Sequence, residues 1–167
     1  MKINVFSYKD AEQKIELNES YRRNWISIRD IGFESIYKKL DELCENVLII
    51  KFDDVTEFNV KHNLIHPFYE RELKNRQLVY FNSEMAREII NFSNKLQNDT
   101  INIHCWAGKS RSQAIAYCLN QYYNLFLENN EEDFIHNLQN SVNNFMGNIT
   151  PQMFIEDYEL VDSYYEF

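Results

Sequence analysis

The segment from Thr100 to Phe126 constrains the fold more than any other part of the 167-residue chain. Its first residues, Thr100 to His104, favour a buried strand, and a helical pattern runs from Ser110 to Phe126. Only three glycines occur in the whole chain, so Gly108 between the two patterns indicates a tight turn. A buried strand joined by a short loop to a helix is a building unit of α/β folds.

Several other segments also have the pattern of a strand or a helix. The apolar run at 47–50 has strand length and suits a parallel sheet that is covered on both faces. Further strands are expected at 3–6 and 25–28, and helices at 33–44, 83–96, 131–145 and 151–164. Ser83 is the expected cap of its helix, and Pro151 lies in the first turn of the last one. The stretch 53–82 has little periodicity, which is typical of a functional loop, with a short helix expected at 69–75.

These alternating patterns predict an α/β fold with a central, mostly parallel sheet of about four to five strands flanked by helices. The length of 167 residues favours a single domain, since about 150 residues per domain is usual. We expect the helical C-terminal part to pack against one face of the sheet.

The charge and cysteine content exclude several functional classes. A net charge of −9 argues against general binding to nucleic acid or to an anionic membrane, because both carry negative charge. No apolar run approaches the roughly 18 residues of a membrane span, and the N-terminal residues lack the pattern of a signal peptide. Cys44, Cys105 and Cys118 are widely spaced and match no metal-site spacing, which favours the reducing cytoplasm.

The loop between the strand and the helix has the residues of an anion-binding site. A loop that leads into a helix N-terminus directs backbone N–H groups and the positive end of the helix dipole toward one point. Arg111 at the end of this loop adds a planar guanidinium that can hold two phosphate oxygens. Cys105 at its start would lie in the same positive field, which is expected to lower the pKa of its thiol.

The segment HCWAGKSRS resembles the HC-x5-R-[ST] signature of the cysteine-dependent protein tyrosine phosphatases, with His104, Cys105, Arg111 and Ser112 at the signature positions. The dual-specificity-like and the bacterial or phage tyrosine-phosphatase-like branches are most similar. Their patterns are also matched by ISIRD at 26–30 and VLIIKFDDV at 47–55. The resemblance implies a phosphatase fold and one phosphatase domain over 1–167. It also implies hydrolysis of phosphate monoesters of proteins, on phosphotyrosine or also on phosphoserine and phosphothreonine.

The resemblance also implies a role for each residue of the loop. Cys105 would be the nucleophile that forms a phosphocysteine, Ser112 would donate a hydrogen bond to its sulfur, and His104 would orient the loop. Phosphate would be bound by the residues that follow the cysteine, which are Trp106, Ala107, Gly108, Lys109, Ser110 and Arg111. The reaction would need no metal and no cofactor, and the partner would be a phosphorylated protein or peptide.

A general acid is needed to protonate the leaving oxygen. The resemblance places it on an Asp that follows a strand, which leaves Asp53 and Asp54, and Asp54 is favoured because it directly precedes Val55. If neither is the acid, the glutamates of the long loop, Glu57, Glu70 and Glu72, are the next candidates.

Two other functions remain open from the sequence. Lys109 weakly favours a phosphatase acting on a phosphoinositide or another small molecule, although a solvated lysine explains it as well. A pseudophosphatase that binds phosphate without hydrolysing it would carry the same loop. Gln152 is a weaker candidate for placing a water, and His62 and His66 are expected at the surface. Cys44 and Cys118 are expected to be buried and unreactive.

Overall fold

The computed structural model describes residues 2–32, 34–62, 65, 71, 74–96, 99–122 and 131–147. Its four described strands form one sheet in the order β1 (Lys2–Ser7), β4 (Thr100–Cys105), β2 (Trp25–Arg29) and β3 (Val47–Lys51). All three pairings are parallel. The expected α/β fold with a central parallel sheet is therefore confirmed, with β4 between β1 and β2.

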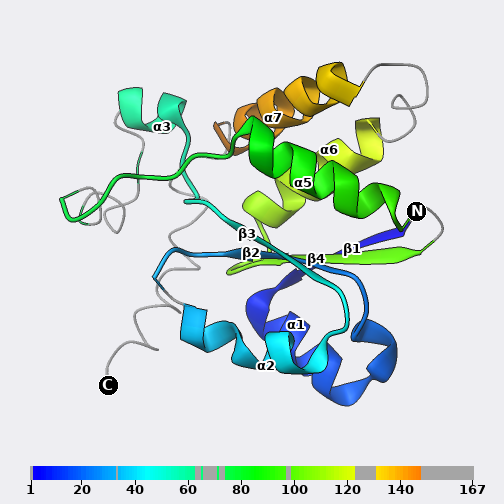
Figure 1. Cartoon of the computed structure of the whole chain (residues 1–167). Coiled ribbons are helices and arrows are strands. Elements are labelled where there is room, and N and C mark those ends of the chain that lie inside the picture. The colour runs from blue at the N-terminus through cyan, green and yellow to red at the C-terminus, as the bar shows by residue number, and fades with distance from the viewer. Residues whose placement is uncertain are drawn as a thin grey trace.

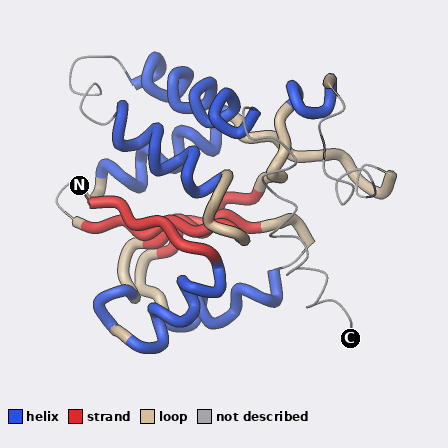
Figure 2. The backbone as a smooth tube through the Cα atoms, turned by 180° about the vertical axis from the view of Figure 1, so that it is seen from behind, coloured by secondary structure: helices blue, strands red, loops and turns tan. Residues whose placement is uncertain are grey.

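The described helices cover both faces of the sheet (Figure 1, and from behind in Figure 2). One face carries α5 (Ser83–Asn94), α6 (Arg111–Tyr122) and α7 (Glu131–Gly147), and the other carries α1 (Tyr8–Leu17) and α2 (Lys38–Leu43). Helix α7 packs on α5 and α6, which contact the strands, so α7 forms a second layer over this face.

Each face of the sheet buries its own apolar core, because side chains of a strand alternate between the faces. Ile103 and Cys105 of β4 belong to the large core under α5 and α6. Trp25 of β2 belongs to a smaller core with residues of α1 and α2, which are Ala11, Ile15 and Leu40. Every residue of β2 is buried, as expected for a central parallel strand.

Several expected elements differ in the structure. The expected helix at 33–44 is divided into a 3-10 turn, Glu34–Tyr37, and α2. Asn82 and not Ser83 caps α5, because the Asn82 side chain accepts a hydrogen bond from the Met85 amide. Helix α6 begins at Arg111, one residue later than expected.

The structure contains three short elements that the sequence analysis does not predict. These elements are α1, a 3-10 turn at Glu19–Tyr21, and α3 (Glu57–Lys61), which begins at a capping box formed by Thr56 and Asn59. The expected helix at 69–75 lies largely outside the described residues, and the one at 151–164 lies entirely outside them. None of the helices in the described part of the chain is long and apolar enough to cross a membrane.

Candidate active site

The candidate site lies at the carboxyl edge of the sheet, where parallel α/β sheets commonly bind ligands. Strand β4 ends at Cys105, and the loop Trp106–Ser110 connects it to α6. Strand β2 ends beside it and is followed by Asp30, and β3 is followed by Phe52, Asp53 and Asp54. Side chains from three strands therefore meet at the N-terminus of one helix.

Cys105 and Ser112 are in contact at the base of the loop. Cys105 Sγ lies 3.1 Å from Ser112 Oγ, within hydrogen-bond range for a sulfur. Both residues are buried, and Ser112 belongs to the first turn of α6. The thiol is thus held next to a hydroxyl and to the positive end of a helix dipole.

Gly108 allows the loop to pass close to the first strand. Its φ angle is +72°, and a Cβ atom on Gly108 would lie 2.6 Å from the amide nitrogen of Ser7. The turn therefore needs glycine for its conformation and for its space. The Gln113 side chain donates to the Gly108 carbonyl at 3.1 Å, which fixes the turn from α6.

The first residues of the loop are supported by the start of α1. The Tyr8 amide donates to the Trp106 carbonyl at 3.0 Å, and the two rings are stacked with centroids 5.9 Å apart. Trp106 and Ala107 are half-buried and Lys109 is exposed, while Ser110 is buried.

Arg111 is 2% exposed and contacts two carboxylates as well as a backbone carbonyl. Its Nη1 atom lies 2.9 Å from Asp30 Oδ1 and donates to the Phe52 carbonyl at 2.9 Å. Its Nε atom lies 3.6 Å from Asp54 Oδ2. The guanidinium is thus placed between the ends of β2 and β3.

Asp54 is joined to the loop as well as to Arg111. Ser110 Oγ donates a hydrogen bond of 2.6 Å to Asp54 Oδ1, and the Asp54 side chain is only 10% exposed. Burial raises the pKa of Asp54, although Arg111 and the Ser110 hydroxyl favour the ionised form. A carboxyl group in this environment holds its proton to a higher pH than an ordinary aspartate, which suits a general acid.

Asp53 is held by a different arginine. Its carboxylate accepts two hydrogen bonds from Arg76, of 2.6 and 2.8 Å, and one of 2.8 Å from the Val79 amide. The side chain is 1% exposed. In the described contacts, Asp54 and not Asp53 is the aspartate that contacts Ser110 and Arg111.

His104 points to the opposite face of the sheet from Cys105 and is part of a buried polar chain. Arg29 Nε donates to Ser27 Oγ at 2.9 Å, and Ser27 Oγ lies 2.7 Å from His104 Nε2. Because the serine oxygen accepts from Arg29, its own proton is available for the imidazole. Burial lowers the pKa of His104 to about 3, so the ring is neutral.

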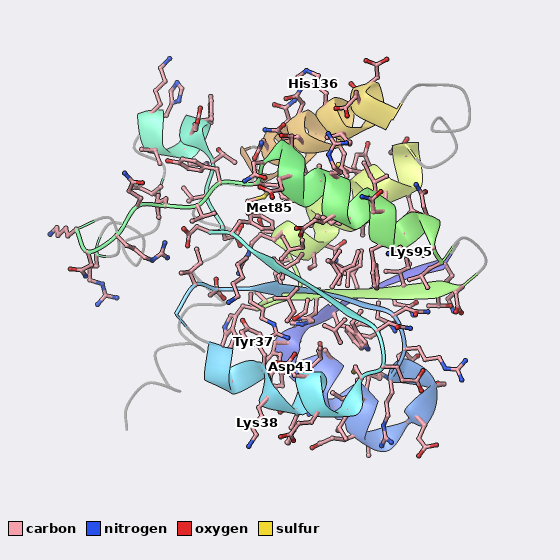
Figure 3. The ribbon with its side chains drawn as sticks, in the orientation of Figure 1. Tyr37, Lys38, Asp41, Met85, Lys95 and His136 are labelled. Atoms are coloured by element: carbon pink, nitrogen blue, oxygen red, sulfur yellow. The ribbon has the colours of Figure 1, made fainter. Side chains whose placement is uncertain are left out.

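This chain continues to α2. Arg29 forms a two-point ion pair with Asp41, and its guanidinium stacks on the Tyr37 ring at 4.8 Å. Tyr37 and Asp41 are labelled in Figure 3, where both lie in the layer of α1 and α2 beneath the sheet. The contacts anchor β2 and β4 directly behind the loop.

Asp30 and Ser27 contact candidate site residues and Arg29 contacts Ser27, although the sequence alone predicts no role for them. A usable signal was present for Asp30, since it directly follows a predicted strand and parallel strands end at one edge. Of the weaker candidates, Glu57 and His62 are exposed on α3 and at its end, and His62 Nδ1 lies 2.9 Å from the Phe58 carbonyl. The others, His66, Glu70, Glu72 and Gln152, lie outside the described residues.

No protein-family model, no curated protein and no solved structure matches this chain. Its function is therefore inferred from its own residues and their geometry.

Proposed function

We propose that the protein is a cysteine-dependent phosphatase of the protein tyrosine phosphatase type that hydrolyses phosphate monoesters of proteins. One observation carries the proposal: Cys105 Sγ lies 3.1 Å from Ser112 Oγ at the base of a loop that ends at the buried Arg111. A thiol, an adjacent hydroxyl and a guanidinium at one helix N-terminus are suited to a nucleophile and to a tetrahedral anion. The parallel α/β sheet, with its site at the carboxyl edge, agrees with this fold type.

In the first step, the Cys105 thiolate attacks phosphorus in line with the leaving oxygen. A sulfur–phosphorus bond forms and the bond to the leaving oxygen breaks. Asp54 gives its proton to that oxygen, so a neutral alcohol or phenol departs. Arg111 and the loop amides stabilise the negative charge that develops on the phosphoryl oxygens.

In the second step, water attacks the phosphocysteine. Asp54, now ionised, accepts a proton from this water, and the sulfur–phosphorus bond breaks. The Ser112 hydroxyl, 3.1 Å from the sulfur, donates a hydrogen bond that stabilises the departing thiolate. Inorganic phosphate is released, and Asp54 is again protonated for the next turnover.

The proposed substrates are phosphorylated proteins or peptides, with phosphotyrosine first, and no cofactor takes part. A phosphoinositide substrate is less favoured, because the net charge of −9 repels a polyanion and Lys109 is the one lysine in the loop. A thiolate nucleophile requires a reducing compartment, so we place the reaction in the cytoplasm. Cys44, Cys105 and Cys118 are all free thiols in the structure.

The test is hydrolysis of an aryl phosphate in the presence of a metal chelator. The wild-type protein should release inorganic phosphate, and Cys105→Ser should abolish turnover while retaining binding of tungstate, because Arg111 and the loop remain. Cys44→Ser is the matched control, and its activity should equal that of the wild type. Tungstate binding without turnover by the wild type would identify a phosphate-binding module instead. Activity that survives Cys105→Ser would exclude the proposed mechanism.

A panel of phosphopeptides would then identify the preferred residue. Phosphotyrosyl peptides should be hydrolysed faster than phosphoseryl peptides of the same sequence. Faster hydrolysis of a soluble phosphoinositide would change the substrate class and leave the chemistry of Cys105 intact.

A further inference from the structure

Asp30 contacts Arg111 although about 80 residues separate them in the sequence. Strand β2 ends at Arg29 and lies beside β4, so the next residue faces the loop that follows β4. Asp30 Oδ1 lies 2.9 Å from Arg111 Nη1, and the side chains of the two residues are 19% and 2% exposed. The pair is therefore largely shielded from water, where screening of charge is weak.

The same nitrogen of Arg111 is held from a second side. Nη1 also donates to the Phe52 carbonyl at 2.9 Å. This one nitrogen therefore has two partners, Asp30 after β2 and Phe52 after β3. Because the guanidinium is planar and rigid, fixing one nitrogen from two directions also fixes the plane of the group. The Nε atom on the other edge then lies 3.6 Å from Asp54 Oδ2, and the second oxygen of Asp54 accepts the hydrogen bond from Ser110.

Asp30 is itself held in place. Its amide lies 3.5 Å from the Tyr37 hydroxyl, and the Tyr37 ring stacks on Arg29. The backbone of Asp30 is therefore held by the residue that precedes α2, while its carboxylate faces Arg111.

We propose that Asp30 is the positioning residue of this site: it orients Arg111 for binding an oxyanion and does not itself touch the substrate. The inference rests on the proposed phosphatase function and adds a residue to it. Asp30 acts in two ways, since it holds the guanidinium and also places a negative charge beside Asp54. That charge is one of the causes that raise the pKa of Asp54.

The first experiment is a double-mutant cycle on tungstate affinity, measured by titration calorimetry. Asp30→Asn keeps the size of the side chain and removes its charge, and it should weaken tungstate binding by roughly 10- to 100-fold, the range for one lost charge-assisted hydrogen bond. In an Arg111→Lys background the same change should have almost no effect, because the guanidinium that Asp30 positions is gone. Asp133→Asn on α7 is the control, an exposed carboxylate that should leave affinity unchanged.

The second experiment is the pH profile of kcat/KM for an aryl phosphate. Removal of the Asp30 charge lowers the pKa of Asp54, so the descending limb should move to lower pH in Asp30→Asn. Asp30→Glu keeps the charge, so its descending limb should lie at the same pH as in the wild type. Its tungstate affinity should recover only in part, because the longer side chain holds Arg111 differently. A role confined to folding would lower the melting temperature without moving this limb.

The outcomes separate this inference from the function on which it rests. If the wild type neither binds tungstate nor hydrolyses the ester, the phosphatase proposal fails, and the role of Asp30 fails with it. If the wild type is active but Asp30→Asn binds tungstate normally, only the positioning role is excluded. An equal loss in the wild-type and Arg111→Lys backgrounds would also exclude it, because the effect would then not pass through Arg111.

Discussion

Ser110 and Asp54 are joined by a hydrogen bond of 2.6 Å, from the serine hydroxyl to one carboxylate oxygen. Ser110 is the last residue before α6 and Asp54 follows β3 by three positions, so this bond links the loop that carries the proposed nucleophile to the segment that carries the proposed acid. The two functional groups are thereby held in one rigid arrangement.

Loss of Asp54 should remove general acid catalysis. The pH profile of kcat/KM for the wild type should be bell-shaped, with a descending limb that reports deprotonation of Asp54. Because burial raises the pKa of Asp54, this limb should lie above the ordinary range for an aspartate. Asp54→Asn should flatten the limb and lower kcat by ~10²–10⁴. Steady-state kinetics with aryl phosphates of differing leaving groups should show the smallest defect for the best leaving group.

Asp53→Asn is the control for this measurement. It removes the ion pair with Arg76 and should lower stability, but the descending limb should persist. If the limb disappears in Asp53→Asn and persists in Asp54→Asn, the two roles are exchanged. If it persists in both, Glu57 is the next candidate among the described residues.

Arg111→Lys should be nearly as damaging as loss of the nucleophile. Lysine keeps the positive charge, but it cannot contact two oxygens of one phosphoryl group or reach both Asp30 and the Phe52 carbonyl. We expect kcat to fall by ~10²-fold or more, as for loss of a transition-state donor. Single-turnover kinetics would measure this step directly, and a near-normal rate would contradict the assigned role.

Gly108→Ala should destabilise the protein more than Gly32→Ala. Both glycines have positive φ angles, +72° and +90°, so alanine is strained at both. Only at Gly108 does the new Cβ meet backbone atoms, of Phe6 and Ser7, within 2.8 Å. We expect a loss of about 1 kcal/mol for Gly32→Ala, from conformation alone. Urea denaturation of both variants measures the difference, and equal losses would show that the contact with Ser7 is not restrictive.

Cys105 should react faster with iodoacetate at neutral pH than the other two cysteines. Burial raises the pKa of Cys44 to about 11 and that of Cys118 to about 12, so few thiolates form there. Arg111 attracts the anionic reagent toward Cys105, and tungstate should protect it. Peptide mapping after brief labelling would identify the modified residue, and preferential labelling of Cys44 would contradict the activated thiol.

His104 should make stability depend on pH. Its pKa falls from 6.5 in the unfolded chain to about 3 in the folded protein, so the unfolded state binds the extra proton between these values. The neutral His104 therefore costs the folded state no stability above pH 6.5. Below pH 6.5 the free energy of unfolding falls with the pH, by up to about 1.4 kcal/mol per pH unit. His104→Gln should remove this dependence, which the difference in unfolding free energy between the two proteins at pH 7 and pH 5 would reveal.

The sequence predicts the local part of the site, and of the residues distant from the loop it names Asp54 but not Asp30. Cys105, Arg111 and Ser112 lie within one short segment, so their spacing alone brings them to one turn. Asp30 reaches Arg111 only because β2 pairs with β4, and no pattern in the sequence specifies which strands are neighbours. The same reason explains why Ser27 was missed as the partner of His104, since their hydrogen bond spans 77 positions.

The fold, like the site, is predicted from the sequence only in part. The sequence predicts the strands because each is a short segment rich in β-branched or aromatic residues. Helix α1 was missed because its buried positions are few and lie between charged residues, with only Tyr8, Ala11 and Ile15 facing the core. Such a helix is stabilised by tertiary packing more than by its own sequence pattern.

The position of β4 links the assembly of the sheet to that of the candidate site. Strand β4 lies between β1 and β2 in the sheet, and its register with β1 sets Lys2 beside Thr100. A growing chain that has not reached β4 has no neighbour for β1 within the sheet and no loop for the oxyanion. Contacts so distant in sequence form slowly, because a long loop must close first. The sheet and the candidate site therefore both depend on one strand whose partners are distant in sequence, because β4 pairs with β1 and also ends at Cys105.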